Sequence, residues 1–287
     1  MNLAVVVLNY NDSQTTIEFI NNARQIQSID KIIIVDNAST DDSWNVLKKY
    51  SCEKIDVIKS EKNCGYAAGN NIGIKYAIKK YQAKYVAVAN PDVILNENAV
   101  YEIINYLTSN SKTGAVSCKM ECKSKIRTRD AWILPDFWDC ILENLILLKR
   151  ILNLKRTSYK SFEGKVSYVE VLPGSFFVMA AEVWENIDYF DEDTFLYGEE
   201  NILAYKLKKE GYKTVLLNDC NYIHNHSVSI SKSIKSIGKK LDMAYDGRCI
   251  YLDKYLKINR MQRLINVITY KVGKINYLLV QRLLKNK

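Results

Sequence analysis

The sequence lacks the cysteine pattern of a disulfide-bonded or zinc-stabilised domain. Its seven cysteines are an odd, scattered set, and Cys118 and Cys122 have no second pair that could complete a zinc site. We therefore expect free thiols in a reducing compartment.

The sequence also lacks a long apolar run. A membrane-spanning helix needs about 20 consecutive apolar residues, and the best candidate, residues 141–155, is interrupted by Glu143, Lys149 and Arg150. The first segment, MNLAVVVLNYND, has no basic start and stops at a polar turn, so it predicts a buried strand rather than a secretory signal. With 287 residues and 48% apolar content, the chain can bury a sizeable core. We expect a cytoplasmic protein that does not cross a membrane.

Excess positive charge is missing from most of the chain. Residues 231–287 carry 14 Lys or Arg and 3 Asp or Glu, whereas residues 1–230 carry 27 and 29. Because Leu, Ile, Val and Tyr alternate with the basic residues, the tail predicts an amphipathic helix on an anionic membrane surface and no nucleic-acid partner. A helix packed on the rest of the protein is the alternative. Residues 131–155 could likewise touch lipid or pack in a core, and either segment could bury apolar surface in a homo-oligomer.

Short apolar runs alternate with longer periodic segments, which is typical of an α/β protein with a mostly parallel central sheet flanked by helices. In the first 110 residues, strands are expected at 3–9, 31–35, 55–59 and 84–89, with helices at 13–26, 43–50, 66–80 and 96–109. Later strands are expected at 166–171, 175–181 and 213–217, with a helix at 200–210. We expect one domain with halves at 1–110 and 111–230, followed by the helical tail at 231–287.

Polar side chains follow the carboxyl ends of three expected strands, where ligands bind in such sheets. Asp36 begins DNASTDDS and could accept hydrogen bonds from a nucleoside or simply stabilise the turn. Asp92 follows Pro91, which stiffens the strand exit. That carboxylate could bind a divalent cation beside a diphosphate, or belong to an ordinary turn.

Three glycines, Gly65, Gly69 and Gly73, are spaced four apart in NCGYAAGNNIG at the start of a predicted helix. The absent side chains allow a close approach, either of a nucleotide or of the sheet beneath the helix. The spacing does not match the dinucleotide-binding fingerprint.

Two further pairs carry possible chemistry. Glu199 and Glu200 lie in the first turn of a predicted helix, where the positive helix end favours an ionised general base, although acidic residues are also common there as partners of the helix dipole. His224 and His226 would point to the same side of a strand. One of them could bind a metal together with Asp92, and a surface pair is the alternative.

Seven segments in series resemble the family 2 glycosyltransferases of the GT-A fold, particularly rhamnosyltransferase-like members. They are VVVLNYND, IIIVDNASTDDS, NCGYAAGNNIG, NPDV, LPGSFFVMAAEVWENIDYFDED, YGEEN and HNHS. The resemblance implies a GT-A type sheet with a C-terminal helical extension. It also implies inverting, metal-dependent transfer from a UDP- or dTDP-linked sugar to a saccharide or lipid-linked acceptor. Such a protein would work at the inner face of the plasma membrane in capsule or O-antigen synthesis.

The resemblance also implies residue roles. The nucleotide sugar would contact Asn9, Tyr10, Asp36, Asn63, Gly65, Asn70, Asn90 and Asp92. Asp92 and His224 would hold Mn²⁺ or Mg²⁺, Gly174 and Ser175 would form the acceptor side, and Glu200 would be the base with Glu199 orienting a hydroxyl. This chain departs from the family's Asp-x-Asp metal motif, because Asn90 replaces the first acid.

Two other functions compete with this interpretation. A sugar-phosphate nucleotidyltransferase would need a glycine-rich basic loop after the first strand, and LNYNDSQTT contains no Gly, Lys or Arg. A non-catalytic nucleotide-sugar-binding component of a polysaccharide assembly complex would have no need of Asp92, Glu199 and Glu200.

Overall fold

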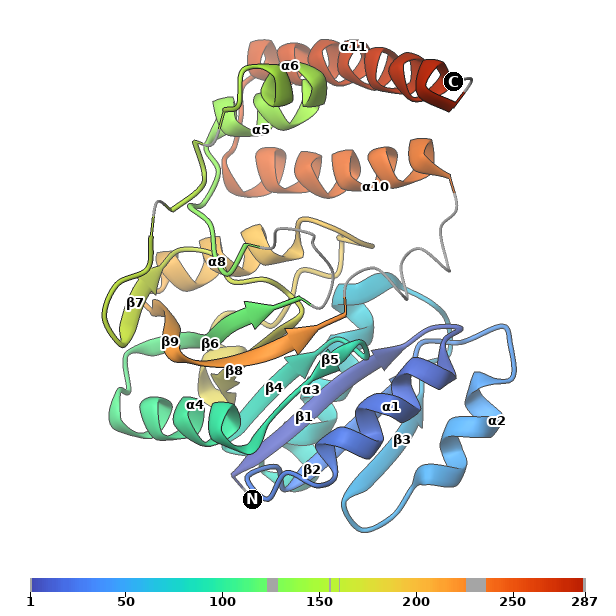
Figure 1. The fold of residues 1–287 in the computed structure, drawn as a ribbon, viewed down its shortest axis with the longest axis vertical. Helices are drawn as coiled ribbons and strands as arrows, with labels where there is room; N and C mark the ends of the chain where they lie inside the picture. Colours follow the sequence, from blue (N-terminus) through green and yellow to red (C-terminus); the bar gives the residue numbers. More distant parts are fainter. Residues whose placement is uncertain (1, 123–128, 155, 160, 226–235, 286–287) are drawn as a thin grey trace.

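One β-sheet with helices on both faces forms the body of the protein, and further helices lie beyond one edge of it (Figure 1). The computed structural model describes residues 2–122, 129–154, 156–159, 161–225 and 236–285. Within these residues the sheet has nine strands in the order β3-β2-β1-β4-β8-β6-β9-β5, with β7 paired to β9. The strands are β1 (Leu3–Asn9), β2 (Lys31–Asp36), β3 (Ile55–Lys59), β4 (Tyr85–Ala89), β5 (Val93–Ile94), β6 (Thr113–Glu121), β7 (Val166–Val169), β8 (Phe176–Ala180) and β9 (Lys213–His224).

The N-terminal half of the sheet is parallel. β1 pairs with β2 and β4, and β2 pairs with β3, all in parallel register. These four strands lie within one residue of their expected bounds. The elements between and after them are α1 (Ser13–Ala23), α2 (Ser43–Leu47), the 3₁₀ turn η1 (Lys48–Tyr50), α3 (Gly65–Tyr81) and α4 (Glu97–Ser109). The register pairs Asn9 with Asp36, so the polar ends of β1 and β2 lie at the same edge.

The other half of the sheet is mixed. β8 is antiparallel to β4 and β6, and β9 is parallel to β6 but antiparallel to β5 and β7. The expectation of a mostly parallel sheet therefore describes only the N-terminal half. Strand β6 was not predicted, and β9 continues past its expected end at 217. A register shift after Cys118 moves its neighbour Lys119 opposite Asn221, and the two strands then pair as far as Glu121 and Ile223.

The remaining helices are α5 (Phe137–Asn144), α6 (Ile146–Ile151), α7 (Ala181–Asn186), α8 (Glu199–Lys209), α10 (Ile237–Ile250), the π-helical turn η2 (Tyr251–Tyr255) and α11 (Arg260–Lys285). The aliphatic helix expected near 141–155 is broken at Leu145, whose backbone is not helical. At the break, the missing side chain of Gly273 lets α11 approach the carbonyl of Asn144; a Cβ there would lie 1.9 Å from its oxygen. No helix among the described residues is both long and apolar enough to span a membrane.

Three buried apolar clusters hold these layers together. One lies between the sheet and α1 and α4, and a second packs α3, α7 and α8 on the other face. The third joins α5 and α8 to η2 through the buried residues Ile141, Ile202, Tyr251 and Leu252. The first part of the expected tail, α10 and η2, is thus packed on α5 and α8 rather than detached from the rest of the protein.

Candidate active site

The ends of β1 and β2 are joined by a buried polar network around Asp36. One carboxylate oxygen of Asp36 accepts hydrogen bonds from the side chains of Asn9 (2.9 Å) and Ser39 (2.6 Å), and the other accepts from the Ser39 backbone (3.2 Å). The Thr16 hydroxyl donates to the side-chain oxygen of Asn9 at 2.9 Å. These hydrogen bonds show that Asp36 stabilises the turn after β2. Its contact with a nucleoside stays a prediction. Tyr10 lies half-buried just beyond this network.

The glycines of α3 are explained by close packing. A Cβ on Gly69 or Gly73 would meet side chains of β1 and β2 at 2.4–2.9 Å. A Cβ on Gly65 would lie 2.2 Å from the carbonyl oxygen of Phe195. Asn63 caps the same turn, because its side-chain oxygen accepts from the Gly65 backbone and from Asn37, each at 3.0 Å. The spacing therefore serves the approach of α3 to the sheet and to the chain around Phe195; a nucleotide contact by Asn63 or Gly65 stays a prediction.

Asp92 and His224 lie side by side after β4 and at the end of β9. Asp92 Oδ1 is 3.1 Å from His224 Nε2, and the antiparallel pairing of β5 with β9 holds the two chains together. His224 Nδ1 lies 3.4 Å from the Met120 sulfur. His226, the other histidine of the sequence, falls outside the described residues.

These two residues fit part of a divalent cation site. Carboxylate oxygen and imidazole nitrogen both bind Mn²⁺, and such a cation often takes its remaining ligands from substrate phosphates and water. Among the described residues, no group of three or more His, Cys, Asp or Glu is arranged to hold a metal by itself. A cation here would therefore depend on the diphosphate of a substrate.

Tyr66, on the first turn of α3, lies at the centre of the acidic residues. Its hydroxyl donates to the carbonyl oxygen of Gly174 at 2.7 Å. Burial raises the pKa of this hydroxyl well above its ordinary value, and the charges of Glu199, Glu200 and Asp92 raise it further. The tyrosine therefore stays protonated, and all three carboxylates lie close enough for their charges to act on it.

The two glutamates differ in their surroundings. Burial raises the pKa of the Glu199 carboxyl well above its usual range, and the neighbouring Glu200 charge adds to this. Burial raises the pKa of Glu200 as well, but the Gly174 backbone hydrogen-bonds to its carboxylate and partly offsets the shift. Within the described part of the chain, one carboxylate oxygen of Glu199 is buried without a hydrogen-bond partner. Glu199 is thus the member of the pair that holds a proton more readily.

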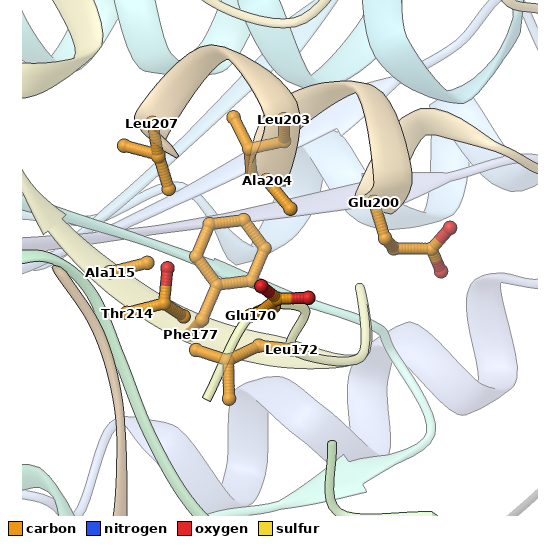
Figure 2. A pocket seen from close by; sticks show the side chains of 9 residues that line it. All are labelled: Ala115, Glu170, Leu172, Phe177, Glu200, Leu203, Ala204, Leu207 and Thr214. Carbon is orange, nitrogen blue, oxygen red and sulfur yellow. The ribbon is translucent and has the colours of Figure 1, made fainter. Parts of the chain in front are cut away.

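The apolar face of α8 fixes where Glu200 points. In Figure 2, Leu203, Ala204 and Leu207 face Phe177 of the sheet, while the Glu200 carboxylate lies apart at the helix start. The cavity among these side chains is only about 10 Å³, which is too small to hold a ligand. The packing of α8 against Phe177 therefore fixes the position of the Glu200 carboxylate at the helix start (Figure 2).

The loop before α8, residues 191–198, is held from two sides. On one side Tyr66 donates its backbone N–H to Phe195 at 2.7 Å. On the other, Asp191 binds both Tyr255 (2.5 Å) and Lys254 (2.8 Å) of η2. Tyr197 and Gly198 both have positive φ values, 71° and 90°. Such backbone persists in a non-glycine residue only where surrounding contacts hold it.

The segment around Gly174 connects the two sides of the site. The backbone N–H of Asn90 donates to the carbonyl oxygen of Ser175 at 2.8 Å. The Ser175 hydroxyl lies 2.7 Å from the Tyr222 hydroxyl. Gly174 would place a Cβ 3.1 Å from Glu200, so a larger residue would crowd the carboxylate. The assignment of Gly174 and Ser175 to the acceptor side stays a prediction.

Sequence patterns alone missed Tyr66 and Asn37. Tyr66 stands within NCGYAAGNN, where the glycines drew attention, and only the fold shows that its hydroxyl reaches the acidic residues. Asn37 donates to both Asn63 and the Gly65 carbonyl, and thereby ties the β2 turn to α3. Its place directly after Asp36 was the available signal.

A family model described as glycosyl transferase family 2 matches residues 4–159, which include the whole N-terminal half of the sheet. The chain belongs to this family. Among curated proteins it is similar to the low-salt glycan biosynthesis hexosyltransferase Agl10 of Haloferax volcanii, with 24% identity over 241 residues, 84% of this chain and 72% of that protein. It is also similar to the rhamnosyltransferase WbbL of Escherichia coli, with 23% identity over 201 residues, 68% of this chain and 72% of that protein. These relatives identify the protein as a glycosyltransferase and confirm the rhamnosyltransferase-like assignment.

Solved structures confirm the GT-A-like fold. The mannosyltransferase PcManGT of Pyrobaculum calidifontis, solved with GDP-Man and Mn²⁺, superposes with a TM-score of 0.60 at 14% identity, over 94% of this chain and 69% of that one. The resemblance at this identity is one of architecture.

Proposed function

We propose that this family 2 enzyme transfers a sugar, with inversion and with the help of a divalent cation, from a nucleoside diphosphate to a saccharide or lipid-linked acceptor. The observation that carries the proposal is that the Tyr66 hydroxyl, hydrogen-bonded to Gly174 beside Glu200, lies close enough to Asp92, Glu199 and Glu200 for their charges to raise its pKa. A cation ligand and a base then flank one place where a sugar can bind. A non-catalytic role is disfavoured because burying the adjacent carboxyl groups of Glu199 and Glu200 is costly, and a module that only binds a nucleotide sugar has no need of them.

Glu200 is the base in this proposal. Because the two carboxyl groups are adjacent, they titrate as a pair, and the more deeply buried Glu199 retains the proton while Glu200 ionises. Ionised Glu200 takes the proton of an acceptor hydroxyl, and that oxygen attacks the anomeric carbon opposite the departing diphosphate. Protonated Glu199 can donate a hydrogen bond to the sugar or the acceptor. A single displacement of this kind inverts the anomeric centre.

The donor side consists of Asp92, His224 and Asn70. Asp92 and His224 would hold Mn²⁺ or Mg²⁺, which neutralises charge on the leaving diphosphate. Asn70 is fully buried, donates to the Tyr66 carbonyl at 2.9 Å, and leaves its own side-chain oxygen without a partner among the described residues. Buried acceptors of this kind are normally satisfied, so a sugar hydroxyl is a fitting partner. PcManGT binds GDP-Man, which supports a nucleotide-sugar donor here as well; the UDP- or dTDP-linked form is our expectation.

A membrane-surface location is supported by α11. Its exposed apolar residues recur every three or four positions and form one stripe: Met261, Leu264, Ile268, Val272, Ile275, Leu279 and Leu283. The helix contains six Lys or Arg and no Asp or Glu. An apolar stripe flanked by positive charge suits the interface of an anionic bilayer. We propose that the enzyme binds the inner face of the plasma membrane and acts in capsule or O-antigen synthesis.

The test replaces Glu200 with Gln and screens donors against acceptors. Glu200→Gln keeps the shape but cannot accept a proton, so we expect nucleotide binding to persist while transfer falls about 10²- to 10⁴-fold. Glu182→Gln is the matched control, because Glu182 is an exposed acid in the first turn of α7 and shares only the helix-dipole role. NMR of the product should show the anomeric configuration opposite to that of the donor. Equal transfer by both variants would exclude Glu200 as the base.

A further inference from the structure

A cavity of about 300 Å³ lies beside the start of α8, where Gly198 and Asn201 contribute to its lining. It is enclosed by the loop before α8, by α5, by α10 and by the chain near residue 130. Gly198 and Asn201, which flank the two glutamates in sequence, line it, whereas Asn9, Asp36, Tyr66 and Asp92 do not. Its volume is at the lower end of small-molecule sites. None of the residues assigned to the donor side lines the cavity, and it lies next to the helix start that carries the proposed base.

Two arginines give this cavity a positive wall. Arg248 of α10 lines it, and its Nε is buried without a hydrogen-bond partner among the residues that the structure describes. Arg129 lines it from the other side and donates a hydrogen bond to the Thr157 hydroxyl at 3.5 Å. The one acid in the wall, Glu143, is already paired with Lys149. A buried guanidinium nitrogen without a partner is costly unless an acceptor binds it.

The two arginines that line the cavity, Arg129 and Arg248, suit a phosphate ligand. Guanidinium groups bind phosphate through two parallel hydrogen bonds, and a pair of arginines suits a group with several anionic oxygens. Trp132 also lines the cavity and is held in place by Asn201, which accepts its indole N–H at 2.8 Å. The cavity thus combines fixed positive charge with an apolar surface beside the base.

We infer that this cavity binds the diphosphate of a prenyl-diphosphate-linked acceptor, with Arg248 as its principal ligand and Arg129 as a second. The inference rests on the proposed function and specifies its acceptor. Figure 1 shows α8, α10 and α11 stacked outward from the sheet. The acceptor's sugar would reach Glu200, its diphosphate would lie against Arg248 of α10, and its prenyl chain would run toward the apolar stripe of α11.

The experiment measures binding of farnesyl diphosphate to the full-length protein by calorimetry, with chelator present so that no cation bridges the probe to Asp92. We expect the parent to bind and Arg248→Gln to raise the Kd about 10- to 100-fold, because a charged hydrogen-bonding group is lost. Arg129→Gln should raise it about 2- to 5-fold, since that residue is exposed. The matched control is Arg260→Gln, which removes one exposed charge from α11 outside the cavity and should leave the Kd unchanged.

A second arm separates the acceptor from the bilayer as the source of phosphate. Binding to vesicles containing phosphatidylglycerol should be the same for Arg248→Gln and the parent. A loss specific to Arg248→Gln would assign the cavity to a phospholipid headgroup and overturn the inference, as would a parent that does not bind farnesyl diphosphate. If Arg248→Gln does not fold, an unchanged Kd in Arg129→Gln overturns it. Failure of the proposed function itself looks different: the parent would release nucleotide from no sugar nucleotide, whatever the binding results.

Discussion

Gly247 allows α10 to touch the loop that carries the acidic pair, so its replacement by alanine tests how the site is assembled. A Cβ at this position would lie 2.0 Å from the carbonyl oxygen of Tyr197 and 3.0 Å from its carbonyl carbon. The backbones would have to separate by about 1 Å to restore ordinary contact, and overpacking of this kind costs about 1–3 kcal/mol. Alanine gains about 1 kcal/mol over glycine in a helix, which leaves a net loss of up to about 2 kcal/mol.

The loss of activity should exceed the loss of stability. Residues 197 and 198 lead directly into Glu199 and Glu200, and a displacement of about 1 Å in a catalytic group can lower turnover about 100-fold. Denaturant unfolding and single-turnover transfer, measured on the same preparations, give the two quantities.

Gly238→Ala is the control within the same helix. A Cβ on Gly238 would find its nearest neighbours at 3.8 and 4.0 Å, so this variant should keep full activity and be as stable as the parent or more so. If Gly247→Ala behaves in the same way, α10 does not position the acidic pair and the reasoning is refuted.

Two further predictions concern pH and the membrane. Burial raises the pKa values of Glu199 and Glu200, so transfer should fall with decreasing pH at values above those of an ordinary glutamate. The folded pair binds protons more tightly than the unfolded chain, so its contribution to the free energy of unfolding is present at acid pH and is lost as pH rises through the raised pKa. Glu199→Gln should flatten this pH dependence in unfolding curves recorded from pH 4 to 8. An unchanged slope of the free energy of unfolding against pH would contradict the assignment. Replacing the exposed Leu264 and Ile268 with Ser should weaken binding to anionic vesicles about 10-fold or more, since each apolar side chain buried in the bilayer contributes about 1.5–3 kcal/mol. The control Tyr101→Ser on α4 should have no effect. Equal vesicle binding by the parent, the double variant and the control would exclude the α11 stripe as the membrane-binding surface.

In the N-terminal half, β1, β2 and β4 could be predicted because each is a mainly apolar run buried on both faces. Val5, Ile33 and Val88 are all completely buried, as the runs around them indicate. In the second half, β7, β8 and the start of β9 match expected strands, but β6 was not predicted. β6 contains Thr113, Ser117 and Lys119, and it becomes a strand only by pairing with β8 and β9, which are distant in sequence. Such pairings leave little local pattern, so the mixed part of the sheet could not be derived.

At the candidate site, the strand-end residues and the acidic pair were visible in the sequence, because turns after buried strands and acids before a periodic helix are local signals. Tyr66 and Arg248 carry no such signal. Tyr66 looks like one more aromatic residue on a glycine-rich helix, and Arg248 looks like one of many charges in a basic tail. Their positions depend on how α3 and α10 pack, and this is decided by glycines that permit contacts at backbone distance.

The basic tail therefore has two parts with different consequences for experiment. α10 and η2 hold the loop at residues 191–198 through Asp191 and Gly247, whereas α11 exposes the apolar stripe. Deletion after residue 230 would remove both, so loss of activity or of vesicle binding in that truncation would not identify the cause. Substitutions on the exposed face of α11 leave the contacts of Asp191 and Gly247 intact. They separate membrane association from assembly of the acidic site, which a truncation cannot do.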